Sequence, residues 1–176
     1  MADSQRIVHL IGTLGQFDAS YKLRELARSQ AVGGSEVTIV AFSASKETRQ
    51  VIENPGVKCQ IVRKRWSYDP FAGRQLAQML RELQATAVFF WGRRATETAL
   101  TVRRALPDSK LIATLVKLPQ TANPWWPNKS LRVLDAIVVE CEATRMEFID
   151  AGQGEEKLHV IPPAVAQPSA EQLLVG

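Results

Sequence analysis

The residues best suited to chemistry follow short apolar runs of the sequence, at the points where those runs end. A glycine-containing segment, Gly12-Thr13-Leu14-Gly15-Gln16-Phe17, follows the first run. Glycine lets the backbone approach a ligand closely, and a helix behind such a loop offers free N–H groups to an anion. The same glycines would also serve a plain tight turn, and both interpretations stay open. The segment has neither the G-x-G-x-x-G pattern nor a P-loop lysine, which argues against a nicotinamide cofactor.

Charged residues follow three later apolar runs. Arg93 comes just after Trp91 and Gly92. Its guanidinium suits a phosphate or a carboxylate, and the alternative is a solvent-facing helix start. Lys117 offers an ammonium group for acid/base catalysis or for anion binding. The equally plausible alternative is that Lys117 is an ordinary surface lysine without a role in a site. Glu142 follows Cys141 at the start of a predicted helix, where helix capping is the role we favour.

A pair of tryptophans, Trp125 and Trp126, lies between Pro124 and Pro127. Tryptophan rings stack on sugars, pack on partner domains or lie at membrane surfaces. Adjacent side chains from an irregular segment diverge, so both rings cannot easily enter one core. We therefore expect at least one ring to be exposed at a ligand site or an interface, with burial of a ring in the core as the alternative.

The sequence shows no set of residues typical of nucleophilic catalysis or of a metal centre. His9 and His159 are the two histidines, and Cys59 and Cys141 are the two cysteines. Neither histidine stands near a candidate nucleophile, so the catalytic residues are unknown, and too few ligands are present for zinc. We interpret His9 as a hydrogen-bonded core histidine and both cysteines as buried, reduced thiols.

Short β-branched runs alternate with amphipathic helical patterns along the chain. The helix after the first run is predicted to bury Leu23, Leu26 and Ala27 and to end at the glycine pair 33–34. Further helices are predicted over 46–53, from Asp69-Pro70, and as a single helix after 87–92 that buries Ala95, Ala99, Val102 and Leu106. The helix from Glu142 is predicted to place Ala143, Met146 and Ile149 inward and to stop at Gly152. The runs predict strands at 7–12, 36–42, 57–62, 87–92, 111–116, 136–141 and 158–161.

This alternation predicts an α/β fold, a doubly wound, Rossmann-like parallel sheet in a single three-layer domain. We expect residues 1–165 to form this domain and 166–176 to begin a linker. Ligands of such sheets bind beyond the carboxyl ends of the strands, so we also expect the main cleft at that edge.

The amino-acid composition limits the classes of binding partner that we expect. The 176 residues carry a net charge of +4, which is too weakly basic to indicate a dedicated nucleic-acid binder. Basic clusters, such as 63–65 and 103–104, are mostly solvated faces, and a minority bind anions or anionic membranes. The short apolar stretch at the N-terminus is not a signal peptide. We therefore expect a cytoplasmic protein, with peripheral contact at the inner face of a membrane as a further option.

Two stretches resemble the N-terminal domain of the family 4 glycosyltransferases, which have the GT-B architecture of two facing Rossmann-like domains. Residues 6–42 are similar to the family's first strand, glycine loop, helix and second strand. Residues 134–165, LDAIVVECEATRMEFIDAGQGEEKLHVIPPAV, are similar to the strand, helix and strand that lead into the second domain. The chain departs from the family pattern at four places. Phe17-Asp18 stands where the family has a glycine pair, and Lys117 stands where many members have a histidine. Cys141 or Glu142 takes the place of a serine, and Pro163-Ala164 takes the place of Asn-Gly.

The resemblance implies the N-terminal half of an enzyme that transfers a sugar from a nucleotide-sugar to a glycan, lipid or small-molecule acceptor. It implies no metal and no cofactor in this half, because the C-terminal domain of the same chain holds the donor. The fragment alone is then expected to be inactive. The alternative is a noncatalytic α/β binding or interaction domain that kept the fold and lost the site. From the resemblance and the loop positions, we expect acceptor-side binding residues at Gly12, Thr13, Gly15, Gln16, Phe17, Trp91, Arg93, Lys117, Trp125, Trp126 and Glu142.

Overall fold

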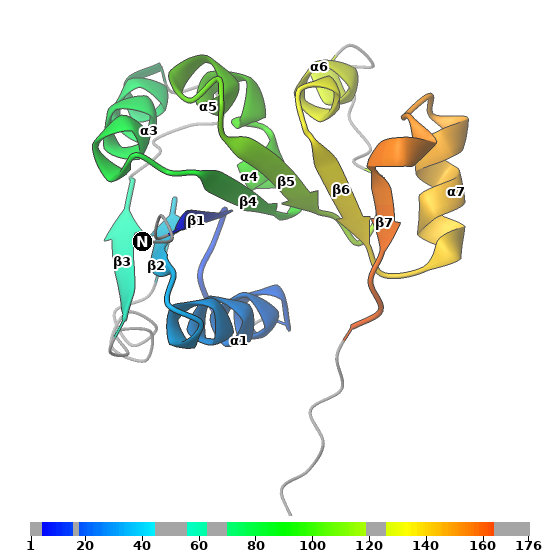
Figure 1. Cartoon of the computed structure of the whole chain (residues 1–176). Helices are drawn as coiled ribbons and strands as arrows, with labels where there is room; N and C mark the ends of the chain where they lie inside the picture. Colours follow the sequence, from blue (N-terminus) through cyan, green and yellow to red (C-terminus); the bar gives the residue numbers. More distant parts are fainter. Residues whose placement is uncertain (1–4, 16–17, 45–55, 63–69, 119–125, 164–176) are drawn as a thin grey trace, which may run out of the picture.

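The computed structural model describes residues 5–15, 18–44, 56–62, 70–118 and 126–163. Its strands form one parallel sheet in the order β3-β2-β1-β4-β5-β6-β7 (Figure 1). The predicted doubly wound α/β fold is therefore confirmed. The strands are β1 (Arg6–Ile11), β2 (Glu36–Ala41), β3 (Val57–Ile61), β4 (Ala87–Trp91), β5 (Lys110–Thr114), β6 (Ala136–Val139) and β7 (Leu158–Val160).

Helices cover both faces of this sheet. In Figure 1, α1 lies below the sheet, whereas α3, α5 and α6 lie above it. This arrangement follows from the strand order, because crossovers that run toward β3 and crossovers that run toward β7 place their helices on opposite faces. The helices are α1 (Asp18–Val32), α3 (Pro70–Leu83), α4 (Gly92–Thr96), α5 (Ala99–Ala105), α6 (Trp126–Arg132), α7 (Glu142–Asp150) and the 3-10 turn η1 (Glu155–Lys157).

Strand alternation divides the core between the two faces. Along β1, Ile7 and Ile11 belong to the cluster that contains Leu23 and Ala27 of α1. Val8 and Leu10 belong to the other cluster, which contains Leu76 and Leu80 of α3 together with Phe90 and Phe148. Because successive side chains of a strand point to opposite faces, one apolar strand supplies both layers.

The predicted helix limits are confirmed where glycine or proline sets them. The last helical residue of α1 is Val32, and Gly34 follows with φ +89°, a conformation that residues with a Cβ rarely adopt. Gly152 has φ +81° just after α7. Pro70 is the first residue of α3, where its missing N–H costs nothing. The helix that the polar stretch 46–53 predicts lies outside the described residues.

Three helix predictions were wrong in detail. Leu26 is exposed although it was expected on the buried face of α1. The single helix expected after β4 is two, α4 and α5, because the N–H and hydroxyl of Thr98 both donate to the Ala95 carbonyl and tighten the chain there. In α7, Thr144 and Phe148 point inward and Met146 is exposed. The ring of Phe148 has the largest apolar surface to bury, and it sets the rotation of α7.

The amino ends of β5 and β6 are joined by one arginine. Arg103 of α5 donates to the carbonyls of Val133, Pro107 and Ser109, and its Nη2 lies 2.6 Å from Asp135 Oδ2. The same carboxylate oxygen accepts the Leu111 N–H at 2.8 Å. Burial raises the pKa of Asp135, but this N–H and the Arg103 guanidinium outweigh burial and lower it overall. The guanidinium therefore connects α5, the following turn and the segment before β6.

We expect Arg103→Lys to lower the free energy of unfolding by roughly 2–3 kcal/mol, because an ammonium cannot reach these carbonyls and the carboxylate together. Arg104→Lys is the matched control. Arg104 is exposed on the same turn of α5, and its substitution should change stability by less than about 0.5 kcal/mol. Urea unfolding of the two variants measures the difference, and equal stabilities would contradict a structural role for Arg103.

Candidate functional site at the carboxyl edge of the sheet

The loop after β1 is fixed by hydrogen bonds to two neighbouring segments. The Leu14 N–H donates to the Ser43 carbonyl at 2.8 Å, beyond the end of β2. The Gly15 N–H donates to the hydroxyl of Ser20 in the first turn of α1 at 3.2 Å. Leu14 is buried and Thr13 is exposed. Thr13 and the start of α1 therefore stand at the edge where a ligand is expected. Gln16 and Phe17 lie outside the described residues.

Gly12 is required by close packing against α4. A Cβ added to Gly12 would lie 2.8 Å from the Cβ of Arg94, which is closer than two such atoms approach. The chain turns into α4 at Gly92, which has φ +73°. The glycines of this edge thus bring the loop after β1 against the helix after β4. Neighbouring β1 and β4 are also where the strand order reverses, the position at which ligands bind in folds of this type.

Trp91, a candidate ligand contact, lies in the core on the α1 side of the sheet. Its Nε1–H donates to His9 Nδ1 at 3.0 Å, and His9 Nε2 lies 2.7 Å from Gln30 Oε1 of α1. Since Nδ1 accepts a hydrogen bond, the proton of the neutral ring is on Nε2 and is donated to Gln30. Trp91 is 8% exposed and His9 is fully buried. The prediction of a hydrogen-bonded core histidine is confirmed, and Trp91 has little surface to offer a ligand.

The two candidate cations of this edge differ in their surroundings. Arg93 is in the first turn of α4, and its Nε lies 3.1 Å from Glu97 Oε1 of the same helix. Its side chain is half exposed, as expected for a solvent-facing helix start. Lys117 is exposed beyond the end of β5. An anion-binding role for either cation stays a prediction.

An ion pair that the sequence did not reveal spans this edge. Lys22 Nζ of α1 lies 2.7 Å from Glu140 Oε1, just beyond the end of β6, and both side chains are 25% exposed. The residues are 118 positions apart, so no local pattern relates them. The pair places an ammonium and a carboxylate together beside the start of α1. It joins α1 to the end of β6 at the carboxyl edge.

Two predictions about the end of β6 were wrong. The strand ends at Val139, so Cys141 is not buried in it but is exposed as the N-cap residue of α7. The pKa of the Cys141 thiol is lowered, mainly by its hydrogen bond with the Thr144 hydroxyl, 3.4 Å away. Glu142 does begin α7, but it does not cap the helix. Its carboxylate pairs with Arg145 at 3.2 Å, and Arg145 also contacts Glu155.

The tryptophan pair is only partly described. Trp126 is the first residue of α6, and nothing is described of its side chain, while Trp125 lies outside the described residues. The expectation that one ring is exposed therefore stays a prediction.

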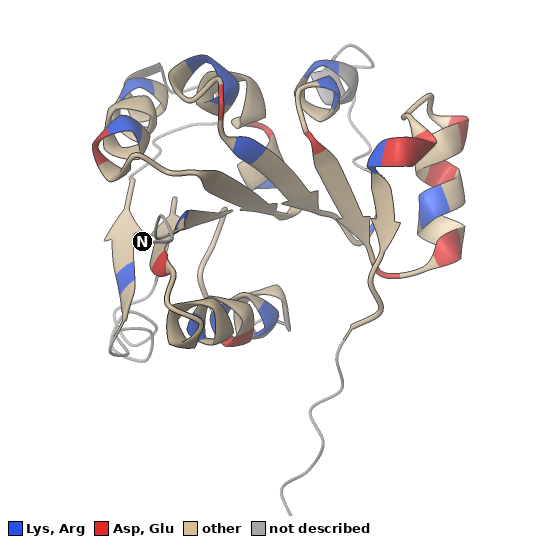
Figure 2. Ribbon diagram, in the orientation of Figure 1, with Lys and Arg blue, Asp and Glu red and all other residues tan. Residues whose placement is uncertain are grey.

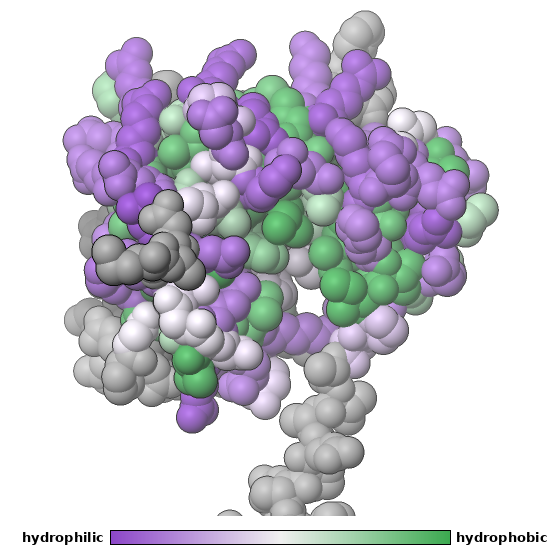
Figure 3. Space-filling model, viewed as in Figure 1, coloured by the Kyte–Doolittle hydropathy of each residue, from purple (hydrophilic) through white to green (hydrophobic). Residues whose placement is uncertain are grey.

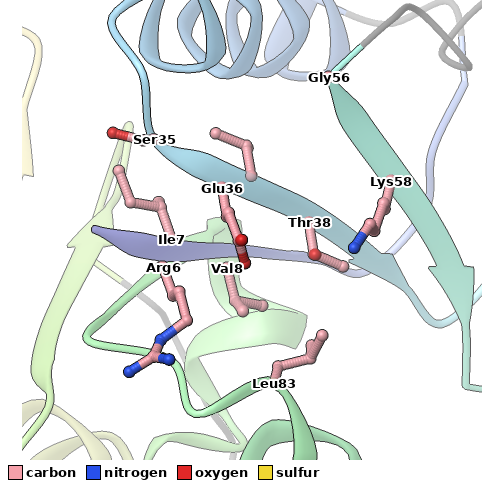
Figure 4. Close-up of a pocket in the computed structure, with 10 residues that line it drawn as sticks. Arg6, Ile7, Val8, Ser35, Glu36, Thr38, Gly56, Lys58 and Leu83 are labelled. Atoms are coloured by element: carbon pink, nitrogen blue, oxygen red, sulfur yellow. The ribbon is translucent and has the colours of Figure 1, made fainter. Parts of the chain in front are cut away.

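A pocket of about 320 Å³ lies at the opposite, amino-terminal edge of the sheet (Figure 4). Side chains of β1, β2 and β3 line it on the face that α3 covers, and Leu83 of α3 closes one side. Its charged lining residues are Arg6, Glu36 and Lys58, so neither sign of charge dominates. The carboxyl-edge loops include residues outside the described ranges, so the expected main cleft at that edge also stays a prediction.

Two features are absent from the described residues. No three side chains of His, Cys, Asp or Glu gather in a way that could hold a metal ion there. Within the same residues, every helix is too short or too polar to cross a lipid bilayer.

Comparison with known proteins gives the family. Residues 22–166 match the family model described as Glycosyltransferase Family 4. The chain belongs to Glycosyltransferase Family 4. No match was found among functionally curated protein sequences. The resemblance seen in the two terminal stretches of the sequence is therefore confirmed at the level of the family.

Solved structures show the same fold. HepE from Anabaena, in complex with UDP and glucose, has a TM-score of 0.70 and 12% identity over 92% of this chain. The lipopolysaccharide outer core galactosyltransferase WaaB has a TM-score of 0.72 and 9% identity over 93% of this chain. A glycosyltransferase from Rickettsia africae has a TM-score of 0.73 and 12% identity over 97% of this chain. This chain covers 45%, 47% and 48% of those chains, so it spans about half their length.

The contact between Gly12 and Arg94 predicts the cost of a single methyl group. We expect Gly12→Ala to destabilise the protein by roughly 1–3 kcal/mol, because two backbone-fixed Cβ atoms would meet and the loop would have to move. Gly73→Ala in α3 is the control. Its Cβ would meet nothing closer than 3.9 Å, and alanine favours a helix by about 1 kcal/mol over glycine. Thermal unfolding should shift in opposite directions, and an unchanged Gly12→Ala variant would show that the loop is not fixed against α4.

The buried histidine predicts a dependence of stability on pH. Burial lowers the pKa of His9 from 6.5 to about 4, and the hydrogen bond with Gln30 opposes this. Between these pH values the unfolded chain binds more protons than the folded chain, so stability present above pH 6.5 is lost as pH falls toward 4. From pH 7 to pH 5 the loss should be about 2 kcal/mol.

Urea unfolding at both pH values tests this loss. His9→Gln should remove most of the pH-dependent difference, although the variant will be less stable at both pH values. His159→Gln should keep it, because His159 is exposed on β7. An unchanged pH slope in His9→Gln would assign the loss to other groups.

Proposed function

We propose that this chain is the N-terminal, acceptor-side half of a glycosyltransferase. The full-length protein would move a sugar from a nucleotide-sugar donor to a glycan, lipid or small-molecule acceptor. The observation that carries the proposal is the family 4 match over residues 22–166 in a domain that spans about half the length of its structural neighbours. The partner that completes the enzyme would be a C-terminal domain of the same chain.

The donor class is inferred from the neighbours. One of them was solved with UDP and glucose, and another is a galactosyltransferase. We infer a nucleoside diphosphate sugar for this protein. In the transfer, the bond between the sugar's anomeric carbon and the diphosphate breaks, and a bond to an acceptor hydroxyl oxygen forms. The hydroxyl proton passes to a base that we do not assign.

The carboxyl edge of the sheet suits a negatively charged ligand. α1 begins there behind the glycine loop, so its free N–H groups and its dipole favour an anion. Lys22, Arg94 and Lys117 add cationic side chains from α1, α4 and the segment after β5. Glu140 holds the Lys22 ammonium in place and neutralises part of its charge. These groups would help to meet the diphosphate charge that the second domain mainly binds.

A second candidate function is a noncatalytic binding domain. The departures from the family pattern at Phe17-Asp18 and at Lys117 favour it, because both fall in loops of the expected site. For either function we propose a location on the cytoplasmic side of a membrane, with peripheral contact at its inner face.

We expect the 176-residue chain alone to show no detectable affinity for nucleoside diphosphate sugars, which for calorimetry means a Kd weaker than about 1 mM. The reason is that the proposed donor-binding half is not in this sequence. Titration calorimetry with a panel of UDP-, GDP- and ADP-sugars measures this, with the product of the complete gene as the positive control. Micromolar binding by the chain itself would mean that the domain is complete, and the proposal of a missing donor half would fail.

A further inference from the structure

The pocket at the amino-terminal edge of the sheet lies apart from the edge at which donor and acceptor are proposed to bind. Neighbouring strands β1, β2 and β3 form its floor, and Leu83 of α3 stands opposite them (Figure 4). α3 keeps hydrophilic side chains on the outer surface of the molecule, as Figure 3 shows, while Leu83 is partly buried against the core. The pocket's volume of about 320 Å³ is near the lower end for ligand sites, so a small molecule fits it.

Charged side chains line the pocket in the order positive, negative, positive across three adjacent strands. Arg6 of β1 lies beside Glu36 of β2 in the register of the sheet. Lys58 of β3 lies beside Thr38, two residues further along β2. Figure 2 shows the acidic start of β2 and the basic position of β3 on neighbouring strands. Residues two apart on a strand face the same side, so these side chains share the face that lines the pocket.

These charges do not neutralise one another. Within the described residues, no ion pair is formed by Arg6, Glu36 or Lys58. Arg6 Nη1 donates to Gln84 Oε1 at 2.9 Å, which holds the guanidinium in place. Arg6 Nε is buried and has no hydrogen-bond partner among the same residues. A buried N–H without an acceptor costs free energy, and an acceptor on a bound molecule would remove this cost.

We propose that this pocket binds a free acidic amino acid, that is, aspartate or glutamate. Such a molecule carries two carboxylates and one ammonium, so it matches two cations and one carboxylate group by group. The Arg6 guanidinium binds one carboxylate, the Lys58 ammonium binds the other, and Glu36 binds the ammonium. The methylene groups lie against Val8 and Leu83, which are apolar lining residues.

The dimensions of the sheet allow one small molecule to reach both cations. Strands are spaced by about 4.8 Å, so Arg6 and Lys58 start about 10 Å apart across the sheet. Their long side chains reduce this separation, and Figure 4 shows the Lys58 side chain directed toward Thr38. A dicarboxylate without an amino group would place negative charge beside Glu36 with nothing to offset it. A neutral amino acid would leave one of the two cations without a partner.

An NMR titration of the isotope-labelled 176-residue chain tests the proposal. At constant ionic strength, we expect glutamate or aspartate to bind with a Kd of about 0.1–1 mM. The backbone amide signals that move should belong to the amino ends of β1, β2 and β3. Glutamine lacks the second carboxylate and glutarate lacks the ammonium, so each should bind about tenfold more weakly than glutamate. No saturable shift with either acidic amino acid up to about 20 mM would overturn the proposal.

Variants of the two exposed charged residues separate their roles. Glu36→Gln should weaken glutamate about tenfold and strengthen glutarate, because the carboxylate that repels a dianion is gone. Lys58→Gln should weaken both ligands. Arg28→Gln is the matched control for the loss of one positive charge, since Arg28 is exposed on α1, across the sheet from the pocket. It should leave both affinities within about twofold. Equal losses in all three variants would show a general effect of charge and overturn the assignment to this pocket.

The remaining outcomes also decide the question. Equal binding of glutamate and glutarate that Glu36→Gln does not change would make the pocket a site for dianions, and would overturn the assignment to an amino acid. Signal shifts confined to the carboxyl edge would place the ligand elsewhere and overturn it as well. Circular dichroism checks that the variants fold, and the comparison of ligands on the unaltered chain needs no variant. The titration involves neither donor nor acceptor, so its failure would leave the glycosyltransferase proposal intact.

Discussion

The pairing of β1 with β4 is the constraint on which the rest of the structure depends. These strands are neighbours in the sheet although α1, two strands and α3 separate them in the chain. On the α1 side, Trp91 of β4 donates to His9 of β1, which in turn donates to Gln30 of α1. A buried polar ring is tolerated only when its nitrogens are hydrogen-bonded, so this chain of contacts fixes the two strands and α1 relative to one another.

The candidate site follows from that pairing. With β1 and β4 side by side, the loop after β1 packs Gly12 against Arg94 of α4, and α1 begins at the same edge. The Lys22–Glu140 pair then joins α1 to the end of β6. The residues that face the edge are thus held by elements whose positions the core has already determined.

Charge is segregated between the two ends of this domain. The helices whose exposed charges are mainly basic, α3, α5 and α6, lie over the face opposite α1, whereas acidic side chains gather on α7 and η1. Core packing does not require this segregation, because these side chains are exposed and their charges do not affect how the core packs. A surface feature that the fold does not need is where a requirement of function is best sought.

The sequence by itself determined the fold class, the family and most element positions. Alternating apolar runs, the glycines at 34 and 152 and the proline at 70 act locally, through backbone geometry and through the period of burial within one element. That is why the parallel sheet and the core role of His9 could be predicted. The burial of Cys141 was predicted from its place in an apolar run. This prediction was wrong because the strand ends at Val139, two residues before Cys141.

Only the tertiary structure decided which side chains meet across the chain. Lys22 and Glu140, and likewise Arg103 and Asp135, are paired by the packing of separate elements, and neither pair has a signature in the sequence. The rotation of α7 was decided in the same way, since its apolar residues surround much of the helix and Phe148 fills the space that β6 and β7 leave. The physical reason is that backbone geometry and the period of burial act within an element, whereas ion pairs, side-chain hydrogen bonds and core contacts depend on the distance between elements.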